Sequence, residues 1–185
     1  MSISRRHLLA SFAATAICAP HVPPANATTF KPEAPTRAAF PVGLYRLDAP
    51  IAELPGLVAF SPNQYAAMGG RQFEGETNYN APTLYFLDHN WAVMLQTVGG
   101  KICKIAIHLV LGTAHDANPV AKNVLSYCVD SLGKPAEQRT EQSVGFVIWD
   151  TTDGNVVLQT GETGGGFAIA LFLTSSSIRN FKRLR

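Results

Sequence analysis

TLYFLDHNWAVMLQTVGGKICKIAIHLVLGTAHDANPVAKNVLSYCVDSL, residues 83–132, is the stretch of sequence that decides the fold. Its first part holds two apolar, alternating runs joined by Gly99-Gly100, a pair that can take positive φ at both positions as a type I′ hairpin turn requires. Both runs are rich in β-branched and aromatic residues, which is typical of half-buried strands. Because side chains alternate along a strand, one face of the second run is the expected core side. That face carries Cys103, Ile105, Ile107 and Leu109.

The rest of the stretch predicts a helix. Asn118 is a favoured N-cap residue, and Pro119 fits the first helical position, where no N–H is missed. Gly133 marks the end of the helix, with Pro135 just beyond it. At about 100° per residue, the apolar side chains fall within an arc of roughly 140°, so this helix should lay one face on the sheet. The arc contains Val120, Ala121, Val124, Leu125, Cys128 and Leu132.

The segments that follow the helix predict a three-stranded antiparallel meander. Its strands are residues 143–150, 155–160 and 167–175, joined by Asp153-Gly154 and by the glycine-rich segment GETGGG. A short helix is expected at the C-terminus, with Ser175–Ser177 as its cap. Residues 61–82 are rich in Gly, Pro and Asn and indicate a long loop. The predicted fold is α+β: an antiparallel sheet of about five to six strands, in the order ββ-α-βββ, with one main helix packed on one face.

The N-terminus has the composition of an export signal. Arg5 and Arg6 precede the weakly apolar run LLASFAATAICA, and Ala25-Asn26-Ala27 offers a cleavage site. The segment Ser4–Leu9 resembles a bacterial twin-arginine export signal, although Ala10 stands where that family often has Lys. An ordinary secretory signal is the alternative. Either reading implies a periplasmic or secreted protein, and the apolar run is shorter than the ~20 residues that a transmembrane helix needs.

Removal of residues 1–27 would leave an extended, Pro-rich lead-in at 28–42 and one domain at 43–185. Arg5 and Arg6 leave with the signal, which brings the 15 Lys and Arg of the whole chain into balance with its 13 Asp and Glu. A mature chain of zero net charge argues against nucleic acid as a partner.

Two cysteines, Cys103 and Cys128, remain after the signal is removed. An even number in an exported chain is compatible with a disulfide. A helix stacked on a sheet, however, keeps its Cα atoms roughly 7–8 Å from the strand, whereas a disulfide needs less than about 6.8 Å. A bridge and two buried thiols both stay open.

Few residues carry recognisable chemistry. His89, His108 and His115, with Asp88 and Asp116, match no zinc-binding spacing, and surface or capping roles are the simpler interpretation. The chain has no G-x-S-x-G nucleophile elbow, and its Gly-rich segments do not continue into a phosphate-binding loop. The residues therefore predict no catalytic residue, no metal site and no cofactor.

The predicted meander is apolar on both of its faces, which points to something that covers the second face. Residues 40–60 could cover it within the chain. Alternatively, Val147, Trp149 and Phe172 form a surface for a protein partner or a second copy.

These features favour a non-catalytic periplasmic binding or accessory module with an unknown partner. The alternative is a small periplasmic hydrolase or metal-dependent enzyme that uses His108, His115 and Asp116. A third class, a structural partner at a membrane surface, would use the basic C-terminal residues, which fall short of a convincing lipid-binding cluster.

Overall fold

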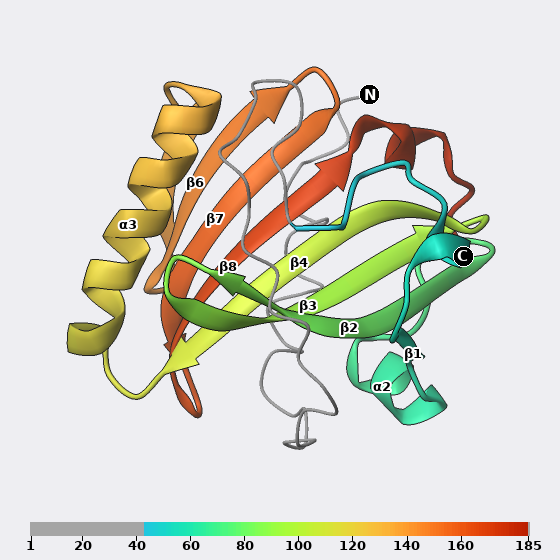
Figure 1. Cartoon of the computed structure of the whole chain (residues 1–185), viewed down its shortest axis with the longest axis horizontal. Coiled ribbons are helices and arrows are strands. Elements are labelled where there is room, and N and C mark those ends of the chain that lie inside the picture. The colour runs from blue at the N-terminus through green and yellow to red at the C-terminus, as the bar shows by residue number, and fades with distance from the viewer. Residues whose placement is uncertain (1–42, 185) are drawn as a thin grey trace.

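The computed structural model describes residues 43–184, which form a single antiparallel sheet with one long helix on one face (Figure 1). The eight strands follow the order β1-β2-β3-β4-β8-β7-β6-β5. The chain builds one half of the sheet, crosses along the helix, and builds the other half from the outer edge inwards, so that β4 and β8 pair at the centre. In chain order the elements are η1 (Ile51–Glu53), β1 (Val58–Ala59), α2 (Pro62–Ala67), β2 (Glu76–Phe86), β3 (His89–Val98), β4 (Lys101–Leu111), α3 (Ala114–Leu132), β5 (Glu137–Glu141), β6 (Val144–Thr151), β7 (Gly154–Thr163), β8 (Gly166–Ser175) and η2 (Ser176–Asn180).

The α+β class, the antiparallel sheet and the single main helix are confirmed, but the predicted number of strands was too low. β5 was missed because this edge strand, EQRTE, has no apolar alternation. The predicted loop at 61–82 contains α2 and the first half of β2. Ser61 and Gln64 form a capping box at the start of α2, a local signal that the glycines and prolines around it obscured.

The long helix α3 begins earlier than the sequence predicted. Its N-cap is Thr113, whose Oγ1 accepts a hydrogen bond from the backbone N–H of Asp116 at 3.2 Å, and Pro119 lies inside the helix. The predicted end is confirmed, since Gly133 caps the helix with φ 81°. The predicted C-terminal helix is the 3₁₀ turn η2, for which Ser175 is the cap.

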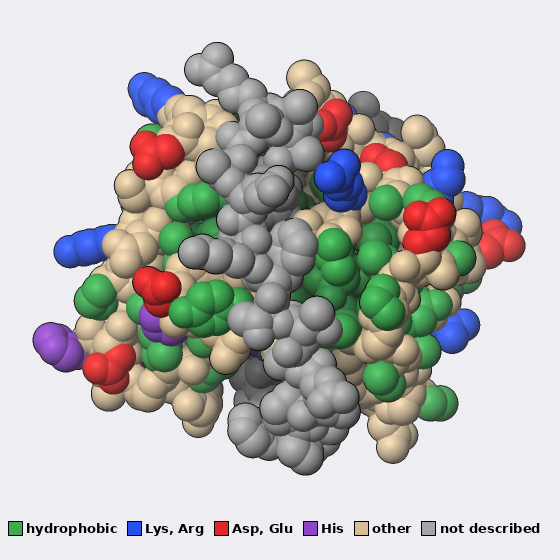
Figure 2. Space-filling view, viewed as in Figure 1, with side chains coloured by type: hydrophobic (Ala, Val, Ile, Leu, Met, Phe, Trp, Pro, Cys, Tyr) green, Lys and Arg blue, Asp and Glu red, His purple; other side chains and the backbone are tan. Residues whose placement is uncertain are grey.

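The side of the sheet that carries α3, the helix face, holds the main core. A cross-strand row of Val93, Ile107, Leu171 and Leu158 runs across β3, β4, β8 and β7, and all four are buried. Figure 2 shows this side of the molecule, with most charged side chains near its outline and hydrophobic side chains nearer the middle. The helix contributes Ala117, Val120, Val124 and Cys128 to the same cluster.

The segment before β1 packs on the helix face as well. Tyr45 is a buried member of the main cluster, and Leu47, Leu54 and Leu57 pack against it. The expectation that residues 40–60 would cover the opposite side of the sheet is therefore wrong for the described part of that segment.

The opposite side, the far face, carries two smaller clusters. One has Ala106, Ile148, Val157 and Phe172 at its centre, with Met68, Met94, Phe146 and Ala170 packed against it. The other joins Phe73, Cys103 and Ile178 to Val98 and Phe181. Within residues 43–184, no helix combines the length and the apolar character needed to cross a membrane.

Candidate functional site

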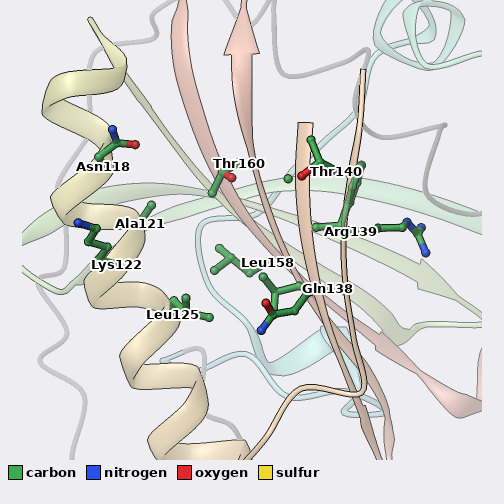
Figure 3. Close-up of a pocket in the computed structure, with 12 residues that line it drawn as sticks. Asn118, Ala121, Lys122, Leu125, Gln138, Arg139, Thr140, Leu158 and Thr160 are labelled. Carbon is green, nitrogen blue, oxygen red and sulfur yellow. The ribbon is translucent and has the colours of Figure 1, made fainter. Parts of the chain in front are cut away.

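A groove of about 390 Å³ lies between α3 and the outer strands β5, β6 and β7 on the helix face (Figure 3). Its volume is near the lower end of the range for small-ligand sites, about 300–1,000 Å³. Three separate elements of the sheet and one helix supply its walls, so the groove exists only in the folded chain.

One wall is a single stripe along α3. It consists of Asn118, Ala121, Lys122 and Leu125, at the spacing i, i+3, i+4 and i+7 that places side chains on one side of a helix. The stripe adjoins the buried positions of the helix, which include Val124. Figure 3 shows Ala121 and Leu125 directed toward the strands.

The floor consists of two cross-strand rows. Gln138, Val147 and Leu158 are paired across β5, β6 and β7, and the next row is Thr140, Gly145 and Thr160. The first row continues the core row of the helix face outward, from Leu171 through Leu158 to Gln138. Along these rows, the side chains become smaller or more polar from β7 to the edge strand β5.

Gly145 occupies the middle of the second row. A Cβ atom at this position would lie 3.0 Å from the Oγ1 of Thr160, closer than such atoms ordinarily approach. Any side chain at position 145 would therefore press against Thr160 in the floor of the groove.

Polar and apolar groups are segregated in the groove. The exposed lining residues from the helix and from the edge strand β5 are all polar, whereas those deeper in the groove are half-buried or buried and mostly apolar. The exposed rim consists of Asn118, Lys122, Gln138 and Thr140. The deeper residues include Ala121, Leu125, Val147 and Leu158, with Thr160 as the polar exception. The groove can therefore take an apolar body and hold a polar group at its mouth.

The geometry of the sheet explains why a groove forms here. The helix α3 packs mainly on β8, with further contacts to β4 and β7. Adjacent strands are rotated by about 20–25° relative to one another, so the outer strands turn progressively away from a straight helix. The space between α3 and β5–β6 is the result.

Arg139 also lines the groove, but its side chain is paired with residues outside the lining. Its guanidinium lies within 2.6 Å of Glu137 Oε1 and 3.1 Å of Glu141 Oε1, and 5.4 Å from the ring centroid of Phe146. Figure 3 shows this side chain directed away from α3. The charge of Arg139 is thus balanced outside the groove.

The structure does not bring the histidines together into one site. His89 begins β3, and its Nδ1 lies 2.8 Å from the carbonyl oxygen of Leu87. His108 lies on the far face between Ala92 and Ala170, and burial lowers its pKa. His115 and Asp116 are in the first turn of α3, where the carboxylate of Asp116 accepts a hydrogen bond from Thr113 at 2.8 Å. Among residues 43–184, no three His, Cys, Asp or Glu side chains are grouped as metal ligands.

The three residues expected to form a partner surface also lie apart. Val147 and Trp149 are on the helix face, where Trp149 is 1 % exposed and donates from Nε1 to the carbonyl oxygen of Gly133 at 2.9 Å. Phe172 is on the far face and is 6 % exposed. The assignment of Val147 to the face away from the helix was wrong, because Val147 pairs with Leu158, which pairs with Leu171, and both of these are core residues of the helix face. Phe172 lies on the face where it was expected. A protein partner or homodimer stays a prediction, without these three residues as one surface.

The two cysteines are free and lie in different clusters on opposite sides of the sheet. Cys103 is the extra residue at the irregularity where Gln96 pairs with Lys104 and Thr97 with Ile102, so its side chain departs from simple alternation. Cys128 belongs to the main core under α3. The predicted common face of these two cysteines was therefore wrong, and the structure contains no bridge between them.

Beside Cys103, the far face buries a cluster of charged and polar groups. Glu76 accepts hydrogen bonds from the backbone N–H groups of Gln72 and Phe73 at 2.7 and 3.0 Å, and from Asn78 Nδ2 at 2.8 Å. Burial lowers the pKa of Lys104 to about 8, although the charges of Cys103 and Glu76 act in the opposite direction. Glu76 and Lys104 are 2 % and 5 % exposed, so both charged side chains are held inside the protein.

Searches with the whole chain matched no protein-family model, no curated protein and no solved structure. The proposed signal residues Arg5, Arg6, Ala25 and Ala27 lie outside the described residues. The patterns along the sequence did not predict the groove. Two features of the sequence could have indicated it. Beside its core residues, α3 carries a second stripe of mixed polar and apolar residues, and on the outer strands several positions that face the helix are Gly, Thr or Gln where apolar residues would be expected.

Proposed function

We propose that the mature protein is a non-catalytic, exported binding module, and that its ligand site is the groove between α3 and β5–β7. The observation that carries the proposal is the segregation of the groove into a polar rim and an apolar floor. Ligand sites commonly combine a mostly apolar surface with a few polar groups that orient the ligand. Catalysis by proton transfer or nucleophilic attack needs a positioned base, and among residues 43–184 the groove lining includes no His, Asp, Glu or Cys.

The binding site can be tested by filling it. Nile red, an uncharged dye whose fluorescence rises in apolar surroundings, would be titrated into the purified mature protein. Gly145→Val adds a side chain to the floor, where even the Cβ atom would meet Thr160 at 3.0 Å, and should weaken dye binding by about tenfold or more. Gly164→Ala is the matched control, because nothing lies within 4 Å of a Cβ atom at that turn position.

A second variant protects the test against misfolding of the first. Ala121→Phe fills the groove from the helix side, and Ala121 is only half-buried. Both filling variants should keep the far-ultraviolet circular dichroism of the wild type. Dye binding that survives in both folded variants, or no dye binding by the wild type, would refute the groove as the ligand site.

The export route is tested separately. The segment around Arg5 and Arg6 resembles a twin-arginine signal. Changing both residues to Lys should therefore leave precursor in the cytoplasm, and intact-mass analysis of the exported wild type should give Thr28 as the first residue. Undiminished export of the double Lys variant would leave ordinary secretion as the route.

The alternative function, a hydrolase or metal-dependent enzyme, has no comparable observation in its favour. His108 and the pair His115 and Asp116 are on different elements, and His108 faces the side of the sheet opposite α3. Replacing His89, His108 and His115 together by Gln should leave dye binding intact. Loss of binding in a triple variant of unchanged melting temperature would count against the groove and in favour of the histidines.

A further inference from the structure

From the distribution of charge around the groove, we infer that its ligand is a small amphiphile with an anionic head group, whose apolar tail lies on the floor and whose head lies beside Lys122. The inference rests on the proposed binding function and specifies the chemical class of the ligand. It also assigns Lys122 a role that the helix pattern alone, which places this residue on the solvent side, does not indicate.

The separation of the lining into two zones predicts the shape of the ligand. Exposed polar residues of the rim come from only two elements, α3 and β5, which face each other across the mouth of the groove. Leu158, in the floor between them, is 3 % exposed. A molecule that is apolar throughout would gain nothing from the hydrogen-bonding groups of the rim, and a wholly polar one would gain nothing from the floor. An amphiphile satisfies both zones.

The charge of the rim predicts the sign of the head group. Lys122 is exposed on the helix wall and has no ion pair within residues 43–184. The other basic lining residue, Arg139, is turned away and paired with Glu137 and Glu141. None of the described residues that line the groove is acidic, so a cationic head would meet repulsion from Lys122 without a counter-charge among them.

Neighbouring groups can assist Lys122 in holding an anion. Asn118 is one helical turn away on the same stripe, and Gln138 and Thr140 lie across the mouth on β5. Each of these side chains can donate a hydrogen bond, as can the Lys ammonium, and an anionic oxygen accepts from all of them. The volume of about 390 Å³ limits the tail to a short chain.

The test compares three probes with the same tail and different heads: octanoate, octanol and octylammonium. Each would displace Nile red from the mature protein at low ionic strength. Octanoate should compete best and octylammonium worst. Lys122→Gln should weaken the binding of octanoate by about two- to fivefold, the range for an exposed ion pair. The binding of octanol should stay unchanged.

Three controls isolate the charge of Lys122. Lys134→Gln removes an equal charge from an exposed position beyond the end of α3 and should have no effect. Lys122→Arg should retain the preference for octanoate. Raising the salt to about 1 M, where the Debye length falls to about 3 Å, should reduce the preference in the wild type.

The outcomes separate this inference from the function on which it rests. Equal competition by octanoate and octanol, or a preference for octanoate that persists in Lys122→Gln, would overturn the anionic head group. If Gly145→Val and Ala121→Phe still abolished dye binding in that case, the groove would remain the ligand site. Failure of every probe and of the dye to bind the wild type would overturn both.

Discussion

Shortening Val124 to Ala should destabilise the protein more than shortening Leu125, although leucine is the larger side chain. The helical pattern places both residues within one apolar arc, and leucine loses more carbon atoms. The structure separates them. Val124 is 0 % exposed in the main core, whereas Leu125 is half-buried in the wall of the groove.

The magnitudes follow from burial. Val124→Ala removes two buried carbon atoms at about 0.8 kcal/mol each, and the closed cavity left behind adds about 1 kcal/mol. The better helix propensity of Ala returns about 0.5 kcal/mol, which leaves a net loss of about 2 kcal/mol. Leu125→Ala removes three carbons that are about half in water already and leaves no closed cavity, so about 1 kcal/mol is expected.

Urea unfolding of the mature protein, followed by circular dichroism, measures both effects as shifts in the transition midpoint. With a slope of about 2 kcal/mol/M, Val124→Ala should lower the midpoint by about 1 M and Leu125→Ala by about half of that. Asn123→Ala is the control. Asn123 directly precedes Val124 and is exposed, so its replacement should change the midpoint little. A larger shift for Leu125→Ala than for Val124→Ala would refute the placement of the groove beside the core.

Three further predictions concern stability and reactivity. Cys103 and Cys128 are free and buried, and burial raises the pKa of each thiol to about 12, so unreduced mature protein should gain two alkyl labels when unfolded and none when native. The pKa of Lys104 is lowered to about 8, below the value of about 10.4 in an unfolded chain, so the unfolded state binds more protons between these values. The stability of the wild type relative to Lys104→Met should therefore rise from pH 8 to 10 in urea unfolding, and a fall would contradict the shift. Ser175→Ala removes a buried hydroxyl that donates to the Asp48 carboxylate at 2.8 Å and caps η2, and should cost about 2 kcal/mol in thermal unfolding; an unchanged midpoint would show that this contact contributes nothing.

The features that the sequence determined by itself are local. Gly99-Gly100 forms the hairpin turn with φ 60° and 76°, and Gly133 ends α3 with a φ that is also positive, 81°. The alternation of β3, β4 and β8 and the helical period of α3 are equally visible along the chain. These features could be predicted because they depend on steric limits and on the spacing of apolar residues within a few positions of one another.

Tertiary structure decided which side each element uses and where a ligand could bind. The irregularity at Cys103 exists only in the pairing of β3 with β4, and it sends that side chain to the far face. The orientation of Val147 follows from the register between β6 and β7, which in turn follows from the pairing of β8 with β4 more than fifty residues earlier in the chain. The groove arises because sheet twist accumulates from β8 to β5 while α3 stays straight. No local pattern encodes that divergence, since it is the sum of small rotations over strands that the chain brings together only on folding.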